Sequence, residues 1–328
     1  MSQTNQTRIP SKEDFAHVGR GLLMGAADII PGVSGGTVAL IVGIYQRLVT
    51  SVSHFDGTLI GHVLQRRWRA AAEHVNLRFL AALGIGIGCG VVALGSVMHS
   101  LLEHQRQFTL AAFFGLIAAS CWLVARYVRR WSAGTIVAVI VGTVFAYWLV
   151  QQETLNHPPD SLWYVFACGV IAICAMILPG ISGSFILVIL GKYHEITGII
   201  KEAAHLQITG HDVATVAVFG SGCIVGLIGF AKVLKWLLWH HHDLTMASLC
   251  GFMAGSLVKI WPFQRDLTPE VTELKHKRFE LIGLSELALD QRFWVTIGIA
   301  MIATGLVLLL DRISRHTSAD GNPSTTIT

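Results

Sequence analysis

The sequence predicts an all-α polytopic membrane protein with two inverted-topology repeats, each made of a re-entrant helical hairpin and three transmembrane helices. Its composition supports the membrane assignment: 53% of the 328 residues are hydrophobic and 13% are charged, and the mean hydropathy is +0.59. These values lie outside the range of ordinary soluble domains. Repetition supports the rest, because the motif Pro-Gly-x-Ser-Gly at Pro31–Gly35 recurs at Pro179–Gly183, 148 residues later.

The motif belongs to a longer duplication. Seven of the fifteen positions from Pro31 to Tyr45 are identical to the positions 148 residues later. A second set of matches has a spacing of 136 residues and comprises Gly84/Gly220, Gly86/Gly222, Gly90/Gly226, His104/His240, Thr109/Thr245, Gly115/Gly251 and Ser120/Ser256. We therefore expect repeat 1 over residues 16–151 and repeat 2 over residues 152–311. The polar segments 1–15 and 312–328 are predicted to be disordered cytoplasmic ends.

Each repeat is expected to begin with a hairpin, over residues 18–50 in repeat 1 and 163–200 in repeat 2. About 30 apolar residues would form a helix of about 45 Å, which is too long for a hydrocarbon core of about 30 Å, whereas each half is too short. A break at Pro31 and Gly32 lets the chain enter and leave on one side, because Pro disfavours helix before it and Gly permits the reversal. Such backbone is tolerated within a membrane only where it is buried in protein or lines a cavity.

Three membrane crossings are expected to follow each hairpin. Five uncharged stretches of 18–20 residues are long enough to cross, namely Phe79–Met98, Phe108–Ala125, Ser132–Val150, Val213–Ala231 and Phe293–Leu310. The sixth stretch, Leu244–Val258, is shorter, but Lys259 extends it because a long basic side chain can reach the interface. Since three crossings change the side of the membrane, the second repeat is predicted to be inverted.

The positive charges predict that both termini are cytoplasmic. With that orientation, fifteen of the 24 Lys and Arg residues lie on the cytoplasmic side, and six of the other nine lie at or within the carboxylate-rich loop Lys259–Arg292. The short loop Gln151–Ser161 on the opposite side has no Lys or Arg, as the positive-inside rule requires. The net charge of +4 reflects this orientation, and we expect no nucleic acid partner, no cofactor and no metal.

The two motifs contain the residue types of an anion site. Ser34 is a good N-cap for the helix that follows, and Gly35 and Gly36 leave backbone N–H groups open to a ligand. Inversion would bring the two turns together near the bilayer centre, where two helix N-termini favour a phosphate or a carboxylate. The structural alternative is that each motif only caps a kinked helix and packs closely. The duplication of the motif favours the ligand site.

Three charged residues are further candidates. Asp28 is the one acid deep in a predicted membrane segment, and Met176 occupies the matching position of the second repeat. An intramembrane carboxylate is costly and marks a functional site by default, so Asp28 is a candidate to couple transport to a proton or to Na⁺. The alternative is that it braces the broken hairpin by a hydrogen bond. Arg47 and Lys192 lie near the ends of the second half-helices, where each either admits an anionic headgroup or anchors the helix at the interface.

A basic segment with an aromatic residue, Arg66-Arg67-Trp68-Arg69, lies between the first hairpin and the first crossing. On the predicted orientation it faces the cytoplasmic lipid surface. Basic residues at that surface are attracted to anionic lipids, so we interpret this segment as an electrostatic anchor.

These motifs resemble those of the bacterial PopT family, which was long a membrane family of unknown function. The resemblance runs from about Gly19 to Leu310, and it is carried by Gly25–Thr37, Leu178–Phe185 with Gly191-Lys192-Tyr193, and Gly255–Leu257 followed by Trp261-Pro262. It implies a polyprenyl-phosphate translocase of the bacterial inner (plasma) membrane that returns undecaprenyl phosphate, the lipid carrier of envelope glycan synthesis, from the outer to the inner leaflet. The headgroup-binding residues that it implies are Ser34, Gly35, Gly36, Thr37, Ser182, Gly183 and Ser184.

Two other functions stay open. A polyprenyl-pyrophosphate phosphatase would need a nucleophile and an acid/base group, yet the motifs offer only Asp28 and hydroxyls, so we do not expect an enzyme. A secondary transporter of a small water-soluble anion fits the same residues. The expected partners are undecaprenyl phosphate, membrane lipids and a coupling proton or Na⁺, and the sequence leaves homo-oligomerisation open.

Overall fold

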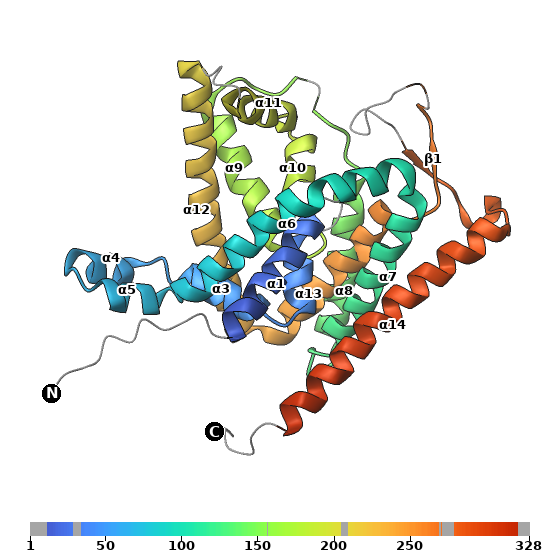
Figure 1. The fold of residues 1–328 in the computed structure, drawn as a ribbon, viewed down its shortest axis with the longest axis horizontal. Coiled ribbons are helices and arrows are strands. Elements are labelled where there is room, and N and C mark those ends of the chain that lie inside the picture. The colour runs from blue at the N-terminus through green and yellow to red at the C-terminus, as the bar shows by residue number, and fades with distance from the viewer. Residues whose placement is uncertain are drawn as a thin grey trace. The chain divides into compact units, whose positions relative to one another are not determined.

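The computed structural model of the chain is shown in Figure 1. It describes residues 12–28, 34–155, 157–204, 209–268, 270 and 279–320. The chain divides into two compact units, one formed by Met1–Met98 with Gln151–Thr245 and the other by His99–Val150 with Met246–Thr328. Each unit therefore combines a segment from each half of the sequence.

All regular elements in the described part of the first unit are helices. Its helices are α1 (Lys12–Asp28), α2 (Gly35–Ile41), α3 (Tyr45–Ser53), α4 (Gly57–Leu64), α5 (Trp68–His74), most of α6 (Leu77–His104), α9 (Leu162–Ile177), α10 (Gly183–Ile189), α11 (Tyr193–Ala204) and α12 (Gly210–His240). The helices α9 and α12 pack closely because small residues lie between them. A Cβ on Gly222 of α12 would collide with the Phe166 carbonyl of α9, and a Cβ on Gly169 would collide with the Phe219 carbonyl. Small residues of this kind let membrane helices approach backbone to backbone.

The second unit contains the other long helices and a small sheet. Its elements are α7 (Arg106–Ala125), α8 (Ala133–Val150), most of α13 (His242–Ser256), the short helix η1 (Leu257–Ile260), β1 (Gln264–Asp266), β2 (Phe279–Leu281), the short helix η2 (Leu284–Glu286) and α14 (Gln291–Asp320). The strands pair antiparallel, with Arg265 opposite Glu280. The helix α14 packs on α7, where Thr304 donates its hydroxyl to the Gly115 carbonyl at 3.1 Å.

Six helices of the described chain are long and apolar enough to cross a membrane: Leu77–His104, Arg106–Ala125, Ala133–Val150, Gly210–His240, His242–Ile260 and Gln291–Leu309. They coincide with the six predicted crossings. The prediction of an all-α polytopic membrane protein is confirmed, and in the part of the chain that the structure describes the only sheet is the pair of short strands β1 and β2. A further apolar helix, Leu162–Ile177, is shorter than a full crossing.

The helix bounds follow the two spacings found in the sequence. At a spacing of 148 residues, α2 and α10 begin at Gly35 and Gly183, and both turns that follow contain a glycine with positive φ, Gly43 at 71° and Gly191 at 72°. At a spacing of 136 residues, α6 and α12 end at His104 and His240. The helices α4 and α5 have no counterpart in the described chain between α11 and α12. The inversion of the second repeat and the re-entrant depth of the hairpins stay predictions.

Candidate functional site at the two Ser-Gly turns

The two motifs, far apart in the sequence, are joined by hydrogen bonds within the first unit. The Ser34 hydroxyl donates to the carbonyl oxygens of Met176 at 3.0 Å and Leu178 at 3.3 Å. In the other direction, the Gly180 N–H donates to the Thr37 hydroxyl at 2.8 Å. The turn before α2, which we call the first turn, and the turn before α10, the second turn, therefore form one site.

Ser34 is the N-cap of α2, as the sequence predicts. Its backbone is extended, with φ −119° and ψ 139°, and its hydroxyl accepts the Gly36 N–H at 3.1 Å. This is the usual way in which a serine satisfies a free N–H group at the start of a helix. The residues of the predicted break itself, Pro31, Gly32 and Val33, lie outside the described residues.

Asp28 lies at the first turn and contacts the start of α2. Its carboxylate accepts the Gly35 N–H with an N–O distance of 2.6 Å. A carboxylate at a helix N-terminus is favoured by the free N–H groups and by the helix dipole. Asp28 thus occupies the place at the first turn that the sequence assigns to an anionic ligand. This contact is the one expected of a brace, and a coupling role for Asp28 stays a prediction.

The glycines of both turns are required by close packing. A Cβ on Gly36 would lie 2.7 Å from the Ile177 carbonyl oxygen, and a Cβ on Gly35 would lie 2.8 Å from the Asp28 carboxylate. A Cβ on Gly183 would lie 2.6 Å from the Ala172 carbonyl oxygen. Substitution at these positions therefore disturbs the protein's own contacts, whether or not a ligand also approaches them.

The second turn is built differently from the first. Ser182 is the N-cap of α10 by position, but its hydroxyl bonds the Ser184 hydroxyl at 2.7 Å instead of capping the helix. Gly180 has a φ of +89°, in the region that favours glycine. Within the described part of the chain, the N–H groups of Gly183 and Ser184 have no hydrogen-bond partner. Ser184 is exposed, whereas Ser182 and Gly183 are buried beside it. The second turn therefore holds two hydroxyls and two N–H groups, and Ser184 is the part of it that a ligand reaches first.

A tyrosine that sequence reasoning left without a role completes the contact between the turns. The buried Tyr45 donates its hydroxyl to the Ile177 carbonyl at 3.1 Å. Together with Ser34 it satisfies three successive carbonyl groups at the end of α9, from Met176 to Leu178. The only signal in the sequence was that Tyr45 is identical to Tyr193 across the repeat.

Among the residues that the structure describes, Arg47 and Lys192 bond to partners outside the two turns. Arg47 contacts the ring nitrogen of His17 at 3.2 Å and lies over the Phe79 ring at 4.5 Å, so it links α3 to α1 and α6. Such a cation–π contact is itself favourable. The buried Lys192 pairs with Glu195 at 2.6 Å and with Asp160 at 3.2 Å. Both sets of contacts suit an anchor, and a role in admitting a headgroup stays a prediction for both residues.

Comparison with known proteins identifies relatives over most of the chain. Residues 24–277 match the model of a family described as undecaprenyl phosphate translocase-like. A polyprenyl-phosphate transporter of Vibrio cholerae is 38% identical over 254 residues, which are 76% of this chain and 78% of that protein. A polyprenyl-phosphate transporter of Staphylococcus aureus is 30% identical over 254 residues, which are 74% of this chain and 84% of that protein. No solved structure matches the chain.

Proposed function

The chain belongs to the undecaprenyl phosphate translocase-like family, and on that premise we propose that it transports undecaprenyl phosphate. The lipid moves from the outer to the inner leaflet of the bacterial inner membrane, where it is used again as a carrier in envelope glycan synthesis. The names of both relatives support a polyprenyl phosphate as substrate. One structural observation supports the proposal most directly: hydrogen bonds join the two Ser-Gly turns. They do so in a protein with six described helices long enough to cross a membrane.

The proposed architecture is a pair of inverted repeats with both termini in the cytoplasm. The first hairpin, residues 18–50, runs from α1 through α2 into α3, and the second, residues 163–200, runs from α9 through α10 into α11. Two features support the hairpins: α2 and α10 have seven residues each, and a helix of that length spans only about 10 Å. The matching starts of α2 and α10 support the repeat. Each hairpin would then enter and leave the membrane on its own side.

The phosphate headgroup binds at the second turn first. Its ligands there are the hydroxyls of Ser182 and Ser184 and the N–H groups of Gly183 and Ser184, which are free of other described partners. Hydroxyls and N–H groups at a helix start are the donors that bind phosphate in many proteins. The polyprenyl tail stays in the bilayer while the headgroup crosses. The phosphate therefore does not cross the hydrocarbon core by itself, where an unpaired charge is strongly disfavoured.

At the first turn the phosphate competes with Asp28. To reach the Gly35 N–H it must displace the carboxylate that now accepts this hydrogen bond, and two negative charges at one helix start repel each other. A proton or Na⁺ on Asp28 removes that repulsion. Occupancy of the first turn by the headgroup is then coupled to occupancy of Asp28 by the ion. We propose this competition as the step that uses the ion gradient.

A transport assay separates the proposed function from its rivals. The purified protein is placed in liposomes that contain labelled undecaprenyl phosphate, and the label in each leaflet is followed beside the release of inorganic phosphate. We expect the lipid to change leaflet without release of phosphate. Phosphate release would indicate a phosphatase, and uptake of free phosphate without lipid movement would indicate a small-anion transporter. Either result would overturn the proposal.

A further inference from the structure

The helices α4 and α5 form a hairpin, residues 57–74, whose apolar surface is not covered by the protein. Figure 1 shows the two helices between α3 and α6 in the chain. The helix α4 has the sequence Gly-Thr-Leu-Ile-Gly-His-Val-Leu, yet none of its residues is buried. Ile60 is 60% exposed and Leu64 is 78% exposed. Because α4 is not one of the six membrane-length helices, a membrane crossing does not explain this apolar surface.

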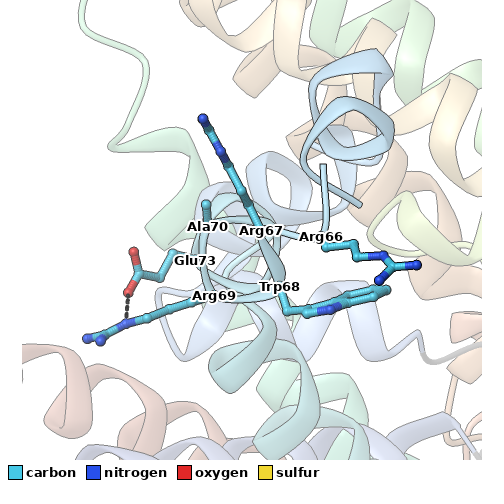
Figure 2. A pocket seen from close by; sticks show the side chains of 6 residues that line it. All are labelled: Arg66, Arg67, Trp68, Arg69, Ala70 and Glu73. Atoms are coloured by element: carbon cyan, nitrogen blue, oxygen red, sulfur yellow. Dashed lines mark hydrogen bonds and ion pairs between the residues drawn. The ribbon is translucent and has the colours of Figure 1, made fainter. Parts of the chain in front are cut away.

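Arginines and a tryptophan follow α4 directly in the chain. Arg66, Arg67, Trp68, Arg69, Ala70 and Glu73 line an open hollow of about 530 Å³. Figure 2 shows Arg66 extending along the Trp68 ring, whereas the side chains of Arg67 and Arg69 point in two other directions. The three guanidinium groups therefore do not converge on one anion. They spread positive charge around a tryptophan that is 64% exposed.

Little of this positive charge is neutralised within the hairpin. Glu73 is its one acidic residue, and it pairs with Arg69 at 3.2 Å while both side chains stay exposed. Exposed pairs of this kind hold their partners weakly. Arg66 and Arg67 form no ion pair with any residue that the structure describes. An anionic partner can therefore reach all three arginines.

The backbone does not account for the arginine at position 66. Arg66 has a φ of 56°, in the left-handed region where glycine and asparagine are favoured. The position lies between Gln65, the C-cap of α4, and Arg67, the N-cap of α5, and arginine is uncommon in this backbone conformation. A role of the Arg66 side chain would explain why arginine is present at a position with positive φ.

The base of the hairpin is fixed to α12. Asp56 accepts the N–H groups of Thr58 and Leu59 and so caps α4, and it also bonds the His74 ring at 3.0 Å. The His54 ring donates to the His74 carbonyl at 2.8 Å and contacts the Lys235 ammonium of α12 at 3.0 Å. These bonds hold the exposed surface in a defined position relative to α12.

We propose that the α4–α5 hairpin lies on the cytoplasmic leaflet and binds its anionic glycerophospholipids. Ile60, Leu64 and Trp68 enter the boundary between headgroups and acyl chains, and the three arginines contact lipid phosphates. Exposed apolar residues beside arginines and a tryptophan are the features of helices that lie in the membrane interface. Anionic lipids attract juxtamembrane basic residues, and the charge of this hairpin is complementary to theirs. The assignment to the cytoplasmic leaflet rests on the proposed orientation.

The test uses the full-length protein with a single cysteine. In a variant whose native cysteines are replaced by serine or alanine, Leu64→Cys carries an environment-sensitive fluorophore. The protein is placed in vesicles of phosphatidylcholine alone or with phosphatidylglycerol, and quenching by neutral acrylamide is measured. We expect the label to be protected only with phosphatidylglycerol. Each arginine that is removed should lower the ratio of docked to undocked hairpin about fivefold.

Two sets of variants make the result specific. The hairpin variants are Arg66→Asn, which suits the left-handed backbone, Arg67→Gln and Arg69→Gln. The matched control, Arg129→Gln with Arg130→Gln, removes two charges from another predicted cytoplasmic loop and should leave protection unchanged. Equal quenching in both lipids, or protection that survives loss of the three arginines, would overturn the proposal. Protection of the label in detergent, without lipid, would also overturn the proposal, because protein and not lipid would then cover the surface of the hairpin. No transport is measured, so failure of this proposal is distinct from failure of the transport proposal.

Discussion

Ser34 and Ser182 occupy equivalent places in the two motifs, but their hydrogen bonds differ. The Ser34 hydroxyl caps α2 and bonds the carbonyls of Met176 and Leu178, whereas the one described partner of the Ser182 hydroxyl is the Ser184 hydroxyl. Ser34→Ala should therefore destabilise the protein, by about 1 kcal/mol for the lost cap. Ser182→Ala should leave stability unchanged and weaken headgroup binding by about 1.5–3 kcal/mol, as expected for a hydrogen bond to a charged group.

Thermal unfolding and binding of labelled lipid phosphate, measured on both variants, check this difference. Ser120→Ala is the matched control, because the Ser120 hydroxyl is buried and its one partner among the described residues is the Leu116 carbonyl of its own helix. Lipid binding by Ser182→Ala at the wild-type level would exclude this hydroxyl from the site.

Asp28→Asn separates bracing from coupling. Asparagine keeps an oxygen that can accept the Gly35 N–H, so the contact at the start of α2 survives, but the side chain can no longer gain or lose a proton. We expect the variant to fold and bind lipid, and to lose the dependence of transport on a proton or Na⁺ gradient. Lipid flux in liposomes with imposed gradients is the measurement. Gradient-stimulated flux that persists in Asp28→Asn would leave Asp28 as a brace only.

Single residues differ in how well the sequence predicts their roles. The capping role of Ser34 was predictable because it depends on neighbours in the chain. For Asp28 the sequence left bracing and coupling open, since the distance to Gly35 depends on how the break folds. The bonds from Ser34 and Tyr45 to α9 were not predictable, because every residue has a carbonyl and only the tertiary packing selects Met176, Ile177 and Leu178.

At the scale of elements, the glycines of α12 divide into two kinds. A Cβ on Gly222 would collide with the Phe166 carbonyl of α9, whereas Gly220 has open space around it. Gly222→Ala should therefore force α9 and α12 apart and cost about 1–3 kcal/mol of stability. Gly220→Ala should be neutral or stabilising, because alanine is the better helix former by about 1 kcal/mol. Unfolding temperatures in one detergent compare the two, and equal temperatures would contradict the packing account.

The long helices were predictable as elements and the short ones were not. About 20 apolar residues without a charge are themselves the signal of a crossing, so all six long helices were expected from composition. The helices α4 and α5 have eight and seven residues. Isolated helices of that length are marginal in water, and their formation depends on contacts such as those of Asp56 with His74.

At the scale of the whole molecule, the proposed topology predicts which loops face the cytoplasm. In a protein without other cysteines, Arg129→Cys should be labelled only from the cytoplasmic side and His157→Cys only from the outside. The prediction follows from three crossings in each repeat and from the distribution of Lys and Arg. A membrane-impermeant thiol reagent, applied to intact cells and to inverted vesicles, checks both positions. Labelling of the two positions from the reverse sides would contradict the orientation.

The central claim is that the two Ser-Gly turns bind the lipid phosphate, and photo-crosslinking tests it most directly. A polyprenyl phosphate with a photoreactive group beside its phosphate is incorporated into liposomes with the protein, and the adducts are mapped by mass spectrometry. We predict adducts at residues 34–37 and 182–184, reduced by an excess of undecaprenyl phosphate and weakened by Ser182→Ala. Adducts confined to other segments, or adducts at the turns that excess undecaprenyl phosphate does not reduce, would contradict the account.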